Sequence, residues 1–347
     1  MVEIQVNDGV AIYNQLIYGQ IDGLKLDDEG NGLAGAVIGL FGADETEFTA
    51  DTAILTTVTV EHGYFRFTQV PFGNWIVREI AAPDGYVLSD ALYPVTIAKD
   101  GTTLAIQITN VRITGAVQLT KVDADYPDNK LSGAEFRVYR DSNGNKELDK
   151  NDEILGNLTE ISTGIYQMDK LMYGGYFVQE IKAPDGFYLD SNAYYFEITQ
   201  HGEIEVVENE AGKGFINDAQ VGSLRIIKTS SDGKVEGFSF RVVGPNGYIK
   251  VFTTDKNGEI VIDGLRIGDY TVSEVANEKS ENYVLPADKD CTIFEGATTK
   301  VEMHNELRDT PKTGDNSNPA LWVALMGISG VAAIACAVCA YKKSRKK

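Results

Sequence analysis

The sequence predicts an all-β protein, built from three tandem β-sandwiches and followed by one transmembrane helix. Turn-forming residues recur every eight to twelve positions, with Val, Ile, Tyr and Phe between them and no helical periodicity. A fourteen-residue pattern occurs three times without gaps, at 12–25, 108–121 and 215–228. Residues 320–341 carry no charged side chain, which is typical of a membrane-spanning helix.

The repeated pattern fixes the expected domain boundaries. Each copy keeps an Asn in third place, a Gly in eighth and a Lys in last place. The copies are about one hundred residues apart, the size of a small domain, so each copy closes one domain and opens the next. We therefore expect domains at 19–114, 115–221 and 222–308.

Residues 1–18 resemble the tail of another β domain. VEIQVNDGVAIYN alternates like a last strand and ends on Asn14, the counterpart of Asn110 and Asn217, but no matching Lys precedes it. The first residues also lack the charged-then-apolar pattern of a signal peptide. We expect that Met1 is not the biological start; the alternative is a short disordered leader.

Each repeat shows the same order of elements. A strand carrying the Lys is followed by an acidic turn and by a strand that begins at a small residue. A variable loop and a Gly turn then lead into a long β-run. The three β-runs are HGYFRFTQVPFGNWIVREI, TGIYQMDKLMYGGYFVQEI and NGEIVIDGLRIGDYTVSEV.

Composition narrows the function classes. The formal net charge is −20 even though five of the last six residues are basic, so the rest of the chain is still more acidic and is expected to repel nucleic acid. The histidines lie far apart in sequence, which argues against a zinc site. Cys336 and Cys339 lie inside the apolar run, and Cys291 has no partner, so no disulfide can brace the chain.

Strand alternation predicts which face the repeated polar residues occupy. In the first strands each Lys shares a face with apolar residues, as with Val117, Leu119 and Lys121. The Glu of the β-run and the Asn of the closing strand follow the same rule. Each domain is therefore expected to direct one Lys, one Glu and one Asn into its core.

Such burial suggests a covalent outcome. Burying an ammonium and a carboxylate costs several kcal/mol each. Desolvation lowers the pKa of Lys and raises the pKa of Glu, so the amine becomes a nucleophile and the protonated Glu can polarise the Asn carboxamide. A Lys–Asn isopeptide bond would form with loss of ammonia. The alternative is a buried Lys–Glu ion pair, hydrogen-bonded to Asn, without a covalent link.

The segments REIAAPDGY and QEIKAPDGF resemble the E-box of the SpaA/Cna-B type domains of Gram-positive pilins and adhesins, whose fold is an Ig-like, prealbumin-like β-sandwich. The similarity extends from about Gly19 to Arg308. It implies that the E-box Glu catalyses the intramolecular bond. The implied sets are Lys25, Glu79 and Asn110; Lys121, Glu180 and Asn217; and Lys228, Glu274 and Asn305. The third segment, SEVANEKSENY, lacks the Ala-Pro-x-Gly run, and in the second domain Asn209 also has inward parity and competes with Asn217.

The C-terminal region resembles a cell-wall sorting signal of the LPXTG type. Thr310, Pro311, Lys312, Thr313 and Gly314 stand in the linker 309–319, before the apolar span 320–341 and the basic tail 342–347. The resemblance implies cleavage by a sortase between Thr313 and Gly314, and transfer of the Thr313 carbonyl to peptidoglycan or to another pilin. The precursor would span the membrane once, with its C-terminus in the cytoplasm. The alternative is a plain single-span membrane protein.

One acidic loop is a candidate calcium site. Oxygen-bearing side chains are spaced along DSNGNKELDKNDE, at Asp141, Asn143, Asn145, Glu147, Asp149 and Asp152. Gly144 does not occupy the position of the EF-hand glycine, and no helices are expected beside the loop. A solvated acidic hairpin loop is therefore the competing interpretation, and no cofactor is required otherwise.

These features predict a wall-anchored surface protein, a stalk of crosslinked β-sandwiches. It would catalyse only its own crosslinks, because no P-loop, dinucleotide fingerprint or Ser/Cys–His triad is recognisable. Three alternatives stay open: an adhesin whose domains bind a host ligand, a minor or basal pilin, and the anchor region of a larger surface enzyme. The absence of a Lys in a Tyr-Pro-Lys context counts against a polymerising shaft pilin.

Overall fold

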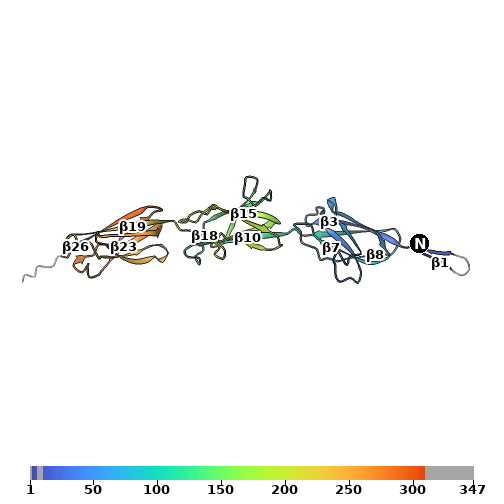
Figure 1. Cartoon of the computed structure of the whole chain (residues 1–347), viewed down its shortest axis with the longest axis horizontal. Helices are drawn as coiled ribbons and strands as arrows, with labels where there is room; N and C mark the ends of the chain where they lie inside the picture. Colours follow the sequence, from blue (N-terminus) through green and yellow to red (C-terminus); the bar gives the residue numbers. More distant parts are fainter. Residues whose placement is uncertain (1, 6–10, 309–347) are drawn as a thin grey trace, which may run out of the picture. The chain divides into compact units, whose positions relative to one another are not determined.

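The computed structural model describes residues 2–5 and 11–308, and its elements are shown in Figure 1. The described residues form β-strands and two short 3₁₀-helices, η1 (Glu61–Gly63) and η2 (Pro245–Gly247), which confirms the all-β prediction. No helix in this part of the chain is both long and apolar enough to cross a membrane. The predicted transmembrane helix at 320–341, the linker 309–319 and the basic tail 342–347 lie outside the described residues.

The chain divides into two compact units, with the boundary between Gln220 and Val221. The first unit holds two β-sandwiches and the second unit holds one, each with its own hydrophobic core. The first unit also begins with a hairpin of β1 (Val2–Gln5) and β2 (Ala11–Asn14), paired antiparallel with Val2 opposite Asn14. The single strand predicted for this region is therefore two strands.

The first sandwich packs a three-stranded sheet against a four-stranded sheet. The three-stranded sheet has the order β6-β3-β9, and the four-stranded sheet has the order β5-β4-β7-β8. The strands are β3 (Tyr18–Asp27), β4 (Val37–Gly42), β5 (Leu55–Val58), β6 (Tyr64–Pro71), β7 (Gly73–Ala81), β8 (Tyr93–Ile97) and β9 (Thr102–Asn110).

The second sandwich repeats this plan, but its closing strand is broken in two. One sheet has the order β13-β14-β10-β17, with β18 also paired to β10, and the other has the order β12-β11-β15-β16. The strands are β10 (Thr114–Asp123), β11 (Glu135–Arg140), β12 (Glu153–Asn157), β13 (Thr159–Ser162), β14 (Ile165–Met172), β15 (Gly174–Lys182), β16 (Ala193–Ile198), β17 (Ile204–Val206) and β18 (Phe215–Asn217). An additional loop, 207–214, separates β17 from β18.

The third sandwich, which forms the second compact unit, has sheets of the order β22-β19-β26-β24 and β21-β20-β23-β25. Its closing strand is continuous, as in the first sandwich. The strands are β19 (Val221–Ser230), β20 (Ser239–Val243), β21 (Ile249–Thr253), β22 (Glu259–Arg266), β23 (Gly268–Val275), β24 (Tyr283–Val284), β25 (Lys289–Ile293) and β26 (Thr298–Leu307).

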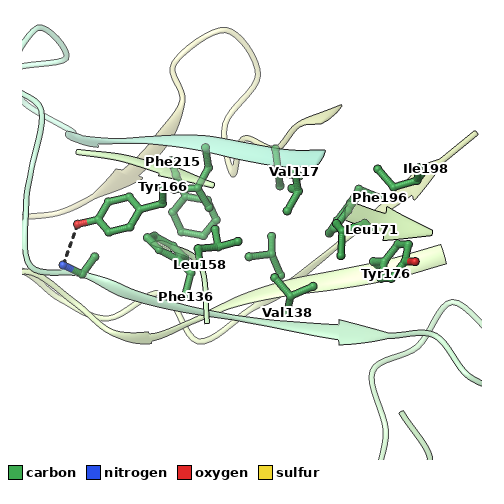
Figure 2. Packing of buried hydrophobic residues seen from close by; sticks show 14 residues of the cluster. Val117, Phe136, Val138, Leu158, Tyr166, Leu171, Tyr176, Phe196, Ile198 and Phe215 are labelled. Atoms are coloured by element: carbon green, nitrogen blue, oxygen red, sulfur yellow. Dashed lines mark hydrogen bonds between the residues drawn. The ribbon is translucent and has the colours of Figure 1, made fainter. Parts of the chain in front are cut away.

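Apolar side chains from both sheets meet inside each sandwich. In the second sandwich, shown in Figure 2, Val117 faces Val138, and the rings of Phe136, Tyr166 and Phe215 pack edge to face. The Tyr166 hydroxyl also accepts a hydrogen bond from the Ala134 backbone N–H. Aromatic rings in this geometry stabilise the fold by more than the burial of their apolar area alone. The Lys, Glu and Asn residues predicted to point inward are buried in the same sandwiches.

Candidate functional site

In every sandwich the first strand pairs in parallel with the closing strand, and this pairing brings the Lys beside the Asn. Asn110 stands opposite Asp27 in the register of β3 and β9, two residues beyond the position opposite Lys25. The same offset relates Lys121 to Asn217 and Lys228 to Asn305. Residues two positions apart point to the same face, so each Lys and Asn are diagonal neighbours within reach of a long side chain.

The Glu reaches the same point from the facing sheet. Glu79 lies on β7, Glu180 on β15 and Glu274 on β23, each opposite an apolar residue of the neighbouring strand. All nine side chains are at most 9% exposed. The inward orientation of Lys, Glu and Asn that alternation predicted is therefore what the structure shows.

A glycine turn packs against the backbone of each Lys. Gly63, Gly164 and Gly258 all have positive φ, and a Cβ at each would come within about 3 Å of the carbonyl oxygen of the Lys. Only glycine combines this φ with such a close approach. The Gly of the Gly turn therefore has a specific role, which is to let the chain pass close to the strand that carries the amine.

In the first sandwich a single oxygen of Glu79 lies close to both the Lys amine and the Asn amide. The Asn110 Nδ2 donates to Glu79 Oε1 at 2.9 Å, and the Lys25 Nζ lies 3.6 Å from the same oxygen. The second oxygen, Oε2, accepts a hydrogen bond from the Ser89 backbone N–H at 2.9 Å. Neither Lys25 Nζ nor Asn110 Oδ1 has a hydrogen-bond partner, although both are buried. Such groups are costly to leave unsatisfied.

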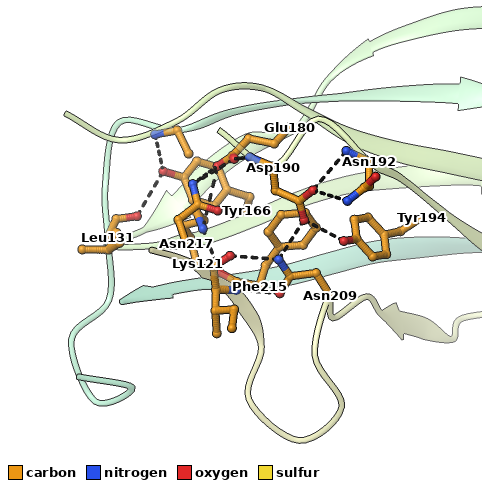
Figure 3. Close-up of polar contacts among 12 residues, drawn as sticks. Lys121, Leu131, Tyr166, Glu180, Asp190, Asn192, Tyr194, Asn209, Phe215 and Asn217 are labelled. Atoms are coloured by element: carbon orange, nitrogen blue, oxygen red, sulfur yellow. Dashed lines mark hydrogen bonds and ion pairs between the residues drawn. The ribbon is translucent and has the colours of Figure 1, made fainter. Parts of the chain in front are cut away.

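The second sandwich, shown in Figure 3, has the same arrangement. Asn217 Nδ2 donates to both oxygens of Glu180, at 3.0 and 2.9 Å, and Lys121 Nζ lies 3.8 Å from Oε1. Lys121 Nζ also donates to the Phe215 carbonyl at 3.0 Å. The Asp190 backbone N–H donates to Glu180 Oε2 at 2.9 Å. The Asn217 Oδ1 is buried without a partner.

Asn209, the competing acceptor, is occupied elsewhere. Its Oδ1 accepts from the Ile216 N–H at 2.7 Å, and its Nδ2 donates to the Ile216 carbonyl at 2.8 Å and to Asp190 Oδ2 at 3.0 Å. The side chain thus imitates a neighbouring strand and holds the end of the 207–214 loop against β18. Alternation fails for Asn209 because this residue lies in the 207–214 loop, which interrupts the closing strand.

The third sandwich departs from the first two. Asn305 Nδ2 donates to Glu274 Oε1 at 2.7 Å, but the Lys228 Nζ donates to the Thr229 carbonyl and lies over the Phe238 ring, 4.3 Å from its centroid. Glu274 Oε2 and Asn305 Oδ1 are buried without partners. The third set is therefore assembled, but its amine is not held at the carboxyl group.

Burial changes the acidity of these groups in the direction that acyl transfer requires. Desolvation lowers the pKa of Lys25 and of Lys228, and it lowers the pKa of Lys121 to about 8, although the neighbouring glutamates act in the opposite direction. Desolvation also raises the pKa of Glu180 and of Glu274. Both effects favour the neutral amine and the protonated acid over the ion pair.

The predicted calcium loop is closed by its own hydrogen bonds. Asp141 accepts from the N–H groups of Gly144 and Lys146, and Asp149 accepts from the side chains of Asn143 and Asn145. Asp152 accepts from the N–H groups of Ser142 and Asp149. Within residues 2–5 and 11–308, no three His, Cys, Asp or Glu side chains are placed to hold a metal ion. Calcium binding stays a prediction. The sorting motif Thr310–Gly314 lies outside the described residues.

Two features of the site escaped sequence reasoning. The backbone N–H groups of Ser89 and Asp190 carry no side-chain signal, and their positions depend on the course of a loop. The rings beside the amines, Phe215 and Phe238, were predictable only as core residues.

A known domain family matches most of the chain. The model of the SpaA prealbumin-like fold domain matches residues 19–112, 115–211 and 222–307. The second match ends before Asn217, within the loop that breaks the closing strand. No curated protein matches the chain by sequence.

Several solved structures are similar to the chain. The TIE protein of Bacillus anthracis is 24% identical with a TM-score of 0.62, over 83% of this chain and 51% of that one, so this chain spans about half its length. BcpA, the major pilin subunit of Bacillus cereus, is 15% identical with a TM-score of 0.40, over 84% of this chain and 99% of that one. The pilus adhesin SpaC of Lactobacillus rhamnosus GG is 15% identical with a TM-score of 0.39, over 87% and 46%.

Proposed function

The chain belongs to the family of SpaA prealbumin-like fold domains, and on this premise we propose that it is a surface stalk whose sandwiches crosslink themselves through Lys–Asn isopeptide bonds. The observation that carries the proposal is the repeated meeting of three buried groups. In each sandwich an Asn amide donates to a Glu oxygen, and in two of them a Lys amine lies beside that same oxygen.

The reaction needs no external reagent. A proton passes from the Lys ammonium to the Glu carboxylate, which leaves a neutral amine and a carboxylic acid. The amine nitrogen attacks Cγ of the Asn while the acid protonates the carboxamide. The Cγ–Nδ2 bond then breaks, ammonia leaves with the proton that the Glu donated, Nζ gives one of its protons back to the Glu, and the new Nζ–Cγ amide remains. The products in the core are an amide and one carboxyl group, in place of a charged pair.

Peptide mapping tests the proposal directly. A protease digest of the folded chain should contain branched peptides that join Lys25 to Asn110 and Lys121 to Asn217, each lighter by one ammonia than the sum of its parts. Linear peptides ending at unmodified Lys25 and Lys121, in a sample shown to be folded, would refute the proposal. They would leave the buried ion pair as the function of these residues.

Crosslinks at these positions would stiffen each sandwich. Each bond would close a loop of roughly 80 to 100 residues, and by the chain-entropy model developed for disulfides such a closure contributes on the order of 4–5 kcal/mol. The first and closing strands are neighbours in one sheet. A pulling force applied to the two ends of a sandwich would therefore pass through the covalent bond instead of separating the paired strands.

We place this stalk on the cell wall because of the sequence that follows it. Thr310–Gly314, the apolar span and the basic tail occur in the order that a sortase substrate requires. A Thr313→Ala variant should remain in the membrane fraction, whereas the native chain should be released by a peptidoglycan hydrolase. Equal release of both forms would refute wall anchoring. The same proposal includes attachment of the chain to other pilins through Thr313.

Ligand binding by the first sandwich is a second candidate function. A surface groove of about 550 Å³ lies on its outer face, lined by Leu24, Val58, Val60, Tyr64 and Ile106 among others. Val60 and Tyr64 are each 60% exposed, although they are large and apolar. Binding of the whole chain to immobilised host matrix proteins, lost in a Tyr64→Ala variant, would support an adhesin. Equal binding by both forms would exclude the groove as the binding site.

A further inference from the structure

In the first two sandwiches a backbone N–H group holds the second oxygen of the catalytic Glu. Ser89 N donates to Glu79 Oε2, and Asp190 N donates to Glu180 Oε2, both at 2.9 Å. Each donor stands ten residues after its Glu, in the loop that joins the Glu strand to the next strand of the sheet. With Oε2 occupied, Oε1 is the oxygen that faces the amine.

The loop that carries this donor is fixed to the closing strand just beyond the reactive Asn. In the first sandwich Tyr86 bridges Arg112, and Val87 donates to the Val111 carbonyl. In the second sandwich Phe187 bridges Ala219. Arg112 and Ala219 stand two positions after Asn110 and Asn217, respectively. The loop therefore ties the Glu and the Asn to one framework, and the donor stands three residues after the bridge.

The third sandwich has the same bridge but a different residue at the donor position. Tyr283 pairs with Leu307, again two residues beyond the Asn, so it is the counterpart of Tyr86 and Phe187. Three residues after it stands Pro286, in YVLP where the first sandwich has YVLS. Proline has no backbone N–H. Glu274 Oε2 accordingly has no hydrogen-bond partner, and the Lys228 amine donates to the Thr229 carbonyl.

We propose that the backbone N–H of Ser89, and of Asp190 in the second sandwich, positions the Glu for crosslinking, and that Pro286 withholds this group in the third sandwich. This proposal rests on the proposed isopeptide chemistry. The N–H holds the carboxyl plane so that one oxygen serves both the Lys and the Asn. Ser89 and Asp190 are positioning residues, because they act through the Glu and do not touch the amine.

Reciprocal exchanges test the proposal within one molecule. The full chain is obtained denatured before crosslinking, with its full sequence mass, and is refolded by dilution. The three branched peptides are then quantified over time. Ser89→Pro should slow the Lys25–Asn110 bond about tenfold or more. Ser89→Ala, which keeps the N–H, should change it less than about twofold, and the Lys121–Asn217 bond in the same chain reports on refolding. Pro286→Ser should accelerate the Lys228–Asn305 bond.

The pH profile of the Lys121–Asn217 bond separates positioning from loss of structure. Burial raises the pKa of Glu180, and the backbone N–H of Asp190 acts to lower it, because it stabilises the ionised carboxylate. Replacing Asp190 by its α-hydroxy acid, which keeps the side chain, should therefore move the acid limb of the rate profile to higher pH. A general loss of structure would lower the rate at every pH without moving the limb.

Several outcomes would overturn the proposal. It fails if Ser89→Pro crosslinks at the native rate, or if Ser89→Ala slows the bond as much as Ser89→Pro does. If Ser89→Pro prevents folding of the first sandwich, a second variant replaces Ser89 by its α-hydroxy acid, which removes the N–H without adding the proline ring. A native crosslinking rate in that variant would also overturn the proposal. A native chain that forms no branched peptide refutes the isopeptide chemistry itself, which is a different result.

Discussion

Lys25 and Glu79 lie 3.6 Å apart, Nζ to Oε1, in an interior where both side chains are fully excluded from solvent. An ion pair in such a place recovers little of the free energy that its desolvation costs. The arrangement recurs in the second sandwich, between Lys121 and Glu180. A reaction that converts the amine to an amide removes this cost permanently, which gives a physical reason for keeping charged residues in the core.

The acidity of Lys121 predicts how stability depends on pH when the bond cannot form. The pKa of Lys121 falls from 10.5 in the unfolded chain to about 8 in the fold, so the unfolded state binds more protons between these values. An Asn217→Ala variant should therefore become more stable as the pH rises from 8 to 10.5, by up to about 3 kcal/mol. Urea unfolding measures this change when it is monitored by hydrogen exchange in peptides of the second sandwich.

The matched control is Lys121→Met, which also cannot form the bond but carries no amine. Its stability should show no comparable rise over the same pH range. If both variants change in parallel, some other group is responsible and the lowered pKa of Lys121 is wrong.

The hydrogen bonds of Asn209 predict that it braces the loop and does not accept the amine. Asn209→Ala should lose the contacts to Ile216 and Asp190 and destabilise the second sandwich by about 1–3 kcal/mol, while the crosslink still forms. Asn217→Ala should abolish the crosslink. Tandem mass spectrometry of the branched peptide identifies the acceptor, and a bond between Lys121 and Asn209 would contradict this assignment.

The third sandwich should form its bond last. Its Lys228 amine must leave the Thr229 carbonyl before it can reach Asn305, and Glu274 has one oxygen without a partner. During refolding, branched peptides from the first two sandwiches should reach completion while the third is still incomplete. Quantitative peptide mapping at successive times shows the order. Completion of the third bond first would mean that the contacts of Lys228 do not limit the reaction.

Much of this site follows from the sequence because strands have a period of two. Alternation alone directs Lys25, Glu79 and Asn110 to one interior, and the spacing of the repeats assigns each Lys to its Asn. The prediction needs no knowledge of how the strands are ordered in the sheets, because any sandwich with these faces inward brings the three residue types into the same core.

The other features of the site depend on interactions that a pattern of residue types does not reveal. The break between β17 and β18 turns Asn209 away from Lys121, because a loop interrupts the alternation. The contrast between Ser89 and Pro286 is visible in the sequence, but its meaning requires the register of the loops against the closing strands. Backbone donors of this kind can be recognised only in three dimensions.

The intact mass of the folded chain decides whether the isopeptide bonds form. It should be lower than the sequence mass by one ammonia for each bond formed, and Glu79→Ala and Glu180→Ala should each restore one ammonia. A folded native chain at its full sequence mass would show that the sandwiches form no isopeptide bond.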